Sequence, residues 1–197
     1  MQTAIANRLT LSQARSFTAT LPGKLVVGLA ATVVIALAAH VAFPLPFTPV
    51  PFTLQPLAVL GVGLALGPVG GFLAVLAYLA EGACGLPVFS PTGPGGLAQL
   101  FGLTGGYLLA YPLVAAIAGG LNRILSRRLA YFASAAIACT AAVIVLFVSG
   151  AAWLMTWTHA SLYAIWIAAV APFLPGEAIK ILAAAGVYST LRRHRHN

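Results

Sequence analysis

The stretch that decides the fold is LAVLGVGLALGPVGGFLAVLAYLAEGA, residues 57–83. It is apolar almost throughout, and it is longer than the roughly 17–25 residues that one membrane-spanning helix needs. Gly67-Pro68 interrupts it, and a proline kinks or breaks the interior of a helix. The stretch is therefore either one long kinked helix or a short span and a longer one joined by a tight turn.

The composition of the whole chain indicates an integral membrane protein. Of the 197 residues, 61% are hydrophobic and 6% are charged, whereas a soluble domain carries about 25% charged residues. The net charge of +8 does not indicate a nucleic-acid-binding protein. The basic residues form short clusters between apolar runs and no continuous basic face.

The basic residues decide between the two alternatives for residues 57–83. Their three clusters are Arg8, Arg15 and Lys24; Arg123, Arg127 and Arg128; and Arg192, Arg193 and Arg195. Cytoplasmic loops collect Lys and Arg, so we expect all three clusters on the cytoplasmic side. All three clusters lie on the cytoplasmic side if residues 57–83 form two spans and residues 151–171 do not cross the membrane.

The predicted fold class is therefore an all-α integral membrane protein with six transmembrane helices and both termini in the cytoplasm. Besides the two spans in 57–83, we expect spans at about 24–42, 107–122, 130–150 and 175–191. The predicted organisation is a cytoplasmic segment 1–23, a membrane domain 24–191 and a basic tail 192–197. The first apolar run is too long for a cleavable signal peptide and lacks a clear small-residue cleavage site.

Three segments without Lys or Arg are then expected outside the cell. They are the Pro-rich loop 43–56, the Gly- and Pro-rich loop 85–106 and the excursion 151–171. The excursion carries aromatic residues that suit a membrane interface, namely Trp153, Trp157, Tyr163 and Trp166.

The chain has only two carboxylate side chains, Glu81 and Glu177. Glu177 comes three residues before Lys180, so both charges lie on one face of the last predicted helix. The pair is either a Glu favoured by the helix dipole beside a snorkelling Lys, or a wall of a binding pocket. Glu81 is expected near the outer end of its span, where it reaches the interface or lines a pocket with Tyr78.

Other residue patterns exclude several functions. The only Gly-Lys pair, Gly23-Lys24, is followed by Leu25, so no phosphate-binding loop for ATP is present. The histidines lack metal-ligand spacing, and no nucleophile-base set is visible, so we predict no enzyme, no metal and no cofactor. Cys84 and Cys139 are expected to be buried free thiols.

A ridge of small residues follows one face of the first span. Gly28, Thr32 and Ala36 recur every four residues, which lets another helix backbone approach closely. The ridge serves either internal packing or docking to a different subunit.

Four stretches of this sequence resemble the signature stretches of the BioY family. They are PLPFTPVPFTLQ at 44–55, GLPVF at 85–89, TGGYL at 104–108 and PGEAIK at 175–180. BioY proteins are the biotin-binding S components of energy-coupling factor transporters, and the resemblance spans roughly residues 25–190. It implies an S-component-like bundle in the plasma membrane that captures biotin from outside. It also implies a transmembrane T component and two ATPase subunits as partners.

The resemblance also implies a biotin pocket and gives the ridge on the first span a role in docking the T component. From the chemistry of biotin, we expect Glu177 to accept hydrogen bonds from its ureido N–H groups and Lys180 to donate to its ureido carbonyl or its carboxylate. The remaining candidate pocket residues are Phe52, Thr53, Gln55, Tyr78, Glu81, Phe89 and Tyr107. Relatives usually carry Asp where this chain has Glu177, which leaves open which end of biotin each charge meets.

A second function class remains open from the residues alone. A stand-alone proton- or ion-coupled carrier would use Glu177 as its titrating group. Two carboxylates are few titrating groups for a proton relay, and we see no inverted repeat of the kind such carriers often carry.

Overall fold

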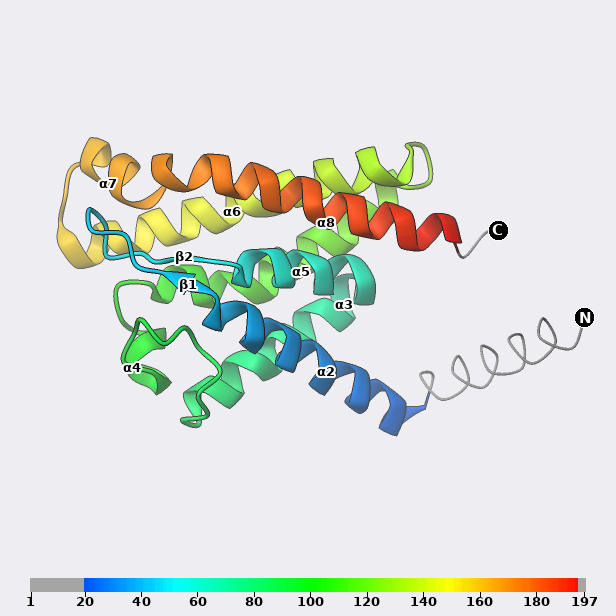
Figure 1. Ribbon diagram of the computed structural model, residues 1–197, viewed down its shortest axis with the longest axis horizontal. Helices are drawn as coiled ribbons and strands as arrows, with labels where there is room; N and C mark the ends of the chain where they lie inside the picture. The colour runs from blue at the N-terminus through cyan, green and yellow to red at the C-terminus, as the bar shows by residue number, and fades with distance from the viewer. Residues whose placement is uncertain (1–19, 195–197) are drawn as a thin grey trace, which may run out of the picture.

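The computed structural model describes residues 20–194, and most of them are helical (Figure 1). The long helices are α2 (Leu21–His40), α3 (Gln55–Ala83), α5 (Gly105–Leu125), α6 (Tyr131–Thr158) and α8 (Leu174–His194). The shorter elements are β1 (Ala42–Phe43), β2 (Phe52–Thr53), α4 (Gly96–Leu100), α7 (Leu162–Ala169) and the 3-10 turn η1 (Ala171–Phe173). The predictions for Arg8, Arg15 and Arg195 lie outside the described residues.

Helix α3 consists of two helical segments that fold back on each other at Gly67. That residue has φ 75° and ψ −176°, which is not a helical conformation. A Cβ placed on Gly71 would lie 3.0 Å from the Cα of Gly63, although eight residues of straight helix span about 12 Å. The prediction of two helical segments is confirmed. Within residues 20–194, five helical stretches are long and apolar enough to cross a membrane, and the break in α3 gives the sixth helix.

Small residues allow this fold-back to pack against α5. A Cβ on Gly63 would lie 2.9 Å from the Cα of Ala115, and one on Gly119 would lie 2.6 Å from the carbonyl carbon of Gly67. Side chains at these positions would separate the backbones, so the glycines set the distance between α3 and α5.

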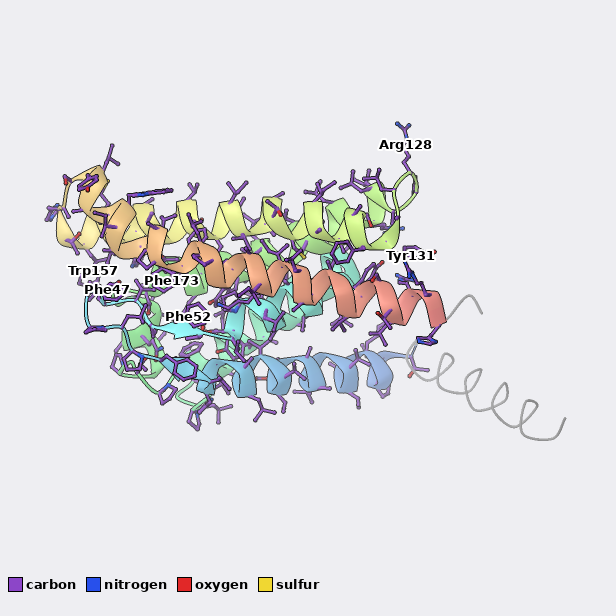
Figure 2. The ribbon with its side chains drawn as sticks, turned by 45° about the horizontal axis from the view of Figure 1, so that its top comes forward. Phe47, Phe52, Arg128, Tyr131, Trp157 and Phe173 are labelled. Carbon is purple, nitrogen blue, oxygen red and sulfur yellow. The ribbon has the colours of Figure 1, made fainter. Side chains whose placement is uncertain are left out.

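The loops and the basic residues lie at opposite ends of the molecule. Figure 2 shows Phe47, Phe52, Trp157 and Phe173 at one end and Arg128 at the other. Helix α2 begins and α8 ends at the end marked by Arg128 (Figure 1). We call the end with Phe47 and Trp157 the loop end, and the end with Arg128 the basic end. The prediction that the basic end faces the cytoplasm stays a prediction.

Several predicted loops contain regular structure. In segment 43–56, β1 and β2 pair antiparallel, with Phe43 opposite Phe52. Segment 85–106 contains α4. The predicted excursion 151–171 is wrong at its start, because α6 continues to Thr158 and ends at His159 in the left-handed conformation (φ 52°). No Gly or Pro lies between Gly150 and His159 to stop the helix earlier.

The cysteines are both free, but only Cys139 is buried. The prediction of burial is wrong for Cys84, which follows the last residue of α3 and is exposed.

The close contact at Gly63 makes a prediction about stability. Gly63→Ala should lower the midpoint of thermal unfolding in detergent, because its Cβ would overlap the backbone of Ala115 at a cost of about 1–3 kcal/mol. Gly61→Ala is the matched control, since nothing lies within 4 Å of a Cβ there. Alanine favours a helix over glycine by about 1 kcal/mol, so the control should be unchanged or more stable. Equal loss of stability in both variants would contradict this account.

Candidate functional site

A buried ion pair lies at the loop end of α8. Lys180 Nζ donates to Glu177 Oε1 at 2.6 Å, and each residue is only 4% exposed. Glu177 lies in the first turn of α8, where the helix dipole favours a negative charge. Both charges must leave water to form the pair, so the surrounding residues have to compensate for the lost hydration.

One oxygen of this carboxylate is not compensated. Glu177 Oε2 is buried and accepts no hydrogen bond from the residues that the structure describes. A buried acceptor without a donor costs about 1–3 kcal/mol, and more when it is charged. The site therefore favours a ligand that brings an N–H or O–H group to this oxygen.

Phe52 covers the other half of the pair. Its ring lies 4.2 Å from Lys180 Nζ, measured to the ring centroid, and stacks on Phe173 at 6.5 Å and an interplanar angle of 6°. Phe52 and Phe173 lie close together at the loop end in Figure 2. Gly176 makes room for this arrangement, because a Cβ there would overlap the Phe52 ring. Strand β2 is thus held against the first turn of α8, and the ammonium gains a cation–π contact.

The ion pair lines a partly open cavity, to which β2, α3, α5, α6 and α8 contribute residues. Its volume is about 60 Å³, well below the roughly 300–1,000 Å³ of sites for small molecules. A ligand larger than a few water molecules therefore needs the surrounding loops to move. The lining residues are Val50, Pro51, Thr53, Gln55, Pro56, Ser90, Gln99, Thr104, Tyr107, Leu108, Tyr111, Leu146, Phe147, Phe173, Glu177 and Lys180.

The structure brings five of the predicted pocket residues to this cavity, namely Thr53, Gln55, Tyr107, Glu177 and Lys180. Phe52 lies directly against it through its contact with Lys180. Tyr107 also has a structural contact, since its hydroxyl donates to the carbonyl of Ala169 at 2.7 Å. That bond holds the end of α7 against α5.

Tyr78 and Phe89 lie behind the cavity wall. The Tyr78 hydroxyl accepts a hydrogen bond from Gln55 Nε2 at 2.9 Å and donates one to the carbonyl of Val88 at 2.9 Å. Phe89 contacts Tyr78 edge to face, with ring centroids 5.5 Å apart. This chain of bonds fixes the amide of Gln55, so Tyr78 orients a lining residue without lining the cavity itself.

Glu81 lies elsewhere. It borders a shallow groove beside α2, together with His40, Pro87 and Val88. The structure therefore does not bring the second carboxylate of the chain to the cavity.

Sequence reasoning missed several lining residues, of which Gln99 carries the clearest signal. Gln99 and Gln55 are the only glutamines after residue 20. Gln99 Nε2 donates to the carbonyl of Ser90 at 3.3 Å, and its Oε1 accepts from the Gly95 amide at 3.1 Å. A lone glutamine in an apolar, Gly-rich segment was a recognisable polar signal. Leu146, Phe147 and Phe173 gave none, because they look like any other apolar residues of a span.

A second hollow of about 360 Å³ lies outside the cavity, between segments 44–51 and 92–104. The two spaces share Pro51, Gln99 and Thr104 as walls. Segment 44–51 is hydrogen-bonded to α7, because the Thr48 hydroxyl donates to the carbonyl of Ala168 at 2.5 Å. The cavity and the outer hollow are therefore adjacent spaces at the loop end.

The ridge on α2 faces partly inward. Thr32 is buried and donates to the carbonyl of Leu29, and Ala36 packs against the core. Gly28 differs, since no atom lies within 4 Å of a Cβ placed there. Internal packing thus explains two members of the ridge, and Gly28 leaves space on the outside.

Comparisons with known proteins show the family of this chain. The model of the BioY family matches residues 9–197. The chain is 35% identical over 178 residues to the biotin transporter BioY of Rhodobacter capsulatus, covering 86% of this chain and 92% of that protein. It is 51% identical over 71 residues to the probable biotin transporter BioY of Pyrococcus horikoshii, covering 36% of this chain and 43% of that protein.

A solved structure is also similar. It is the S component for biotin from an ECF-type ABC transporter, with a TM-score of 0.78 and 28% sequence identity. The alignment covers 86% of this chain and 90% of that chain.

The ion pair makes a prediction about stability. Lys180→Met should lower the stability of the protein by about 3–5 kcal/mol, because it leaves Glu177 as an unpaired buried charge. The double variant Glu177→Leu/Lys180→Met should recover most of that loss, since it buries no charge. Thermal unfolding in detergent measures both. If the double variant is as unstable as Lys180→Met, the effect comes from lost packing and not from the unpaired charge.

Proposed function

The chain belongs to the BioY family, and on this premise we propose that it captures biotin from outside the cell as the S component of an energy-coupling factor transporter. BioY proteins are multi-pass membrane transporters and not enzymes. One observation supports the assignment most directly: Glu177 lines the cavity, and one of its buried carboxylate oxygens has no donor. Relatives named as biotin transporters and a biotin S component do not favour the stand-alone ion-coupled carrier.

The ureido group of biotin is the end that suits this oxygen. It carries two N–H donors, and either one would satisfy Glu177 Oε2. The carboxylate of biotin brings only acceptors and a second negative charge, which would repel Glu177 at short range. We therefore place the ureido group against Glu177 and the carboxylate away from it.

The other lining residues fit the rest of the ligand. Lys180 is already paired with Glu177 and keeps donors for the ureido carbonyl. The rings of Phe52 and Tyr107 cover the apolar thioether ring of biotin. Gln55, with its amide held by Tyr78, presents its carbonyl oxygen to a second donor.

Binding requires a larger cavity than the one described. The loop between β1 and β2 separates the cavity from the outer hollow, and the hydrogen bond from Thr48 to Ala168 holds that loop closed. We infer that biotin enters from the outer hollow as this loop moves. Its return excludes water and strengthens the polar contacts to Glu177 and Lys180.

Uptake needs partners that hydrolyse ATP. The sequence has no phosphate-binding loop for ATP, and the similar solved structure is a component of an ABC transporter. We propose a transmembrane T component and two ATPase subunits as partners. Gly28 on α2 is the member of the small-residue ridge that has room for a helix of the T component.

The proposed contact with the ureido group is tested by biotin titration of the purified protein. Glu177→Gln should weaken binding about 10- to 100-fold, because a charge-assisted hydrogen bond contributes about 1.5–3 kcal/mol. Glu81→Gln makes the same chemical change outside the cavity and should bind like the parent. Equal weakening in both variants would show that this cavity is not the biotin site.

A biotin derivative with an amidated carboxyl group tests the orientation. If the carboxylate lies away from Glu177, the amide should lose the same factor of affinity in the parent and in Glu177→Gln, since distant changes add. A variant that no longer distinguishes biotin from its amide would place the carboxylate beside the ion pair. The ligand would then bind in the opposite direction.

Docking to the T component gives a separate prediction. Gly28→Leu should reduce co-purification of the T component and ATPase subunits several-fold while leaving biotin affinity unchanged, because its side chain fills the open space on α2. Gly186→Leu is the matched control on α8, where a Cβ also meets no atom within 4 Å. Normal assembly of the Gly28→Leu variant would exclude this ridge as the docking surface.

A further inference from the structure

An apolar groove runs along the outside of the helix bundle between α3 and α8. Its volume is about 250 Å³. We call it the α3–α8 groove. It is lined by Leu57, Gly61, Leu64, Ala65, Ala183, Ala184, Val187, Tyr188 and Leu191. Tyr188 is the only one of these residues with a polar side-chain atom, so the groove suits a hydrocarbon chain.

Small residues give the groove its depth and direction. Gly61 and Ala65 come from the first segment of α3, and Ala183 and Ala184 come from α8. No atom lies within 4 Å of a Cβ placed on Gly61. Eight helical residues separate Leu57 from Ala65, so the groove is about 12 Å long. Helix α8 runs toward the basic end (Figure 1), so the groove lies along the bundle axis and ends near the basic tail.

An arginine lies at that end of the groove. Arg192 Nε donates to the Tyr188 hydroxyl at 3.0 Å, and the guanidinium carbon lies 5.3 Å from the centroid of the Tyr188 ring. These contacts hold the guanidinium against a lining residue. Its terminal N–H groups keep the fork geometry that binds phosphate oxygens.

Within residues 20–194, no carboxylate pairs with this arginine. The chain has only two acidic side chains, Glu81 and Glu177. Glu177 pairs with Lys180 at the loop end, and Glu81 borders the separate shallow groove beside α2 that also contains His40. Neither Arg192 nor Arg193 pairs with a carboxylate of the described residues, so an anion from outside can pair with them. At a membrane surface the abundant anion is the phosphate of a lipid, which attracts a basic residue by about 1 kcal/mol.

We propose that the α3–α8 groove binds one phospholipid. Its acyl chain lies along Gly61 and Ala184, and its phosphate contacts the Arg192 guanidinium held by Tyr188. Because no acidic side chain shares this end of the groove, the site prefers an anionic lipid to a zwitterionic one. The lipid spans the same depth of the bilayer as the groove, with its headgroup at the level of the basic residues.

Native mass spectrometry of the delipidated full-length protein tests the proposal. The probes are dioleoyl-phosphatidylglycerol and dioleoyl-phosphatidylcholine, titrated separately. The first phosphatidylglycerol should bind about fivefold more tightly than phosphatidylcholine, and Arg192→Gln should remove that difference. Arg128→Gln makes the same change of charge at the same end of the molecule, away from the groove, and should keep the preference. Excess glycerol 3-phosphate should not displace the lipid, because it lacks the acyl chain that fills the groove.

Filling the groove gives the second arm of the test. Gly61→Leu and Ala183→Leu should each weaken binding of both lipids, whereas Gly186→Leu, which lies outside the lining set, should not. The two filling variants come from different helices, so a folding defect in one leaves the other as the test. Unchanged lipid affinity in both variants would overturn the proposal. If these variants instead lose assembly with the T component, the groove is a protein interface and not a lipid site.

Discussion

The burial of Glu177 beside Lys180 is the interaction on which the loop end of this protein depends. Two charges inside a membrane protein have to be paired and screened from lipid, and each surrounding element contributes to that. The ring of Phe52 lies over the ammonium, and Gly176 leaves the space for the ring. One carboxylate oxygen stays without a donor. The protein therefore keeps an unsatisfied acceptor on a residue that lines the cavity.

The two halves of the bundle have different packing. Toward the basic end, α3 folds back at Gly67, and glycines bring it against α5 so closely that added side chains would not fit. At the loop end, short strands and loops surround the cavity, and their contacts include the hydrogen bond from Thr48 to Ala168 and the stacking of Phe52 on Phe173. We expect the loops, and not the closely packed α3 and α5, to move when the cavity enlarges for a ligand.

The sequence was sufficient for the number of long helices, because the break at Gly67-Pro68 and the positions of the arginines permit few arrangements. It also identified the ion pair, since only two carboxylates are present. The sequence did not distinguish residues that line the cavity from residues behind its wall. Tyr78 and Tyr107 look equivalent in sequence, yet only Tyr107 lines the cavity. The side on which a helical residue lies depends on the packing of neighbouring helices, as the inward position of Thr32 also shows.

The central claim is that the free oxygen of Glu177 receives the ureido group of biotin. A crystal structure of the complex tests it most directly. We expect a ureido nitrogen about 2.7–3.2 Å from Glu177 Oε2 and the biotin carboxylate directed away from the ion pair. A complex with the biotin carboxylate bound to Lys180, or with biotin outside the cavity formed by β2, α3, α5, α6 and α8, would contradict the account.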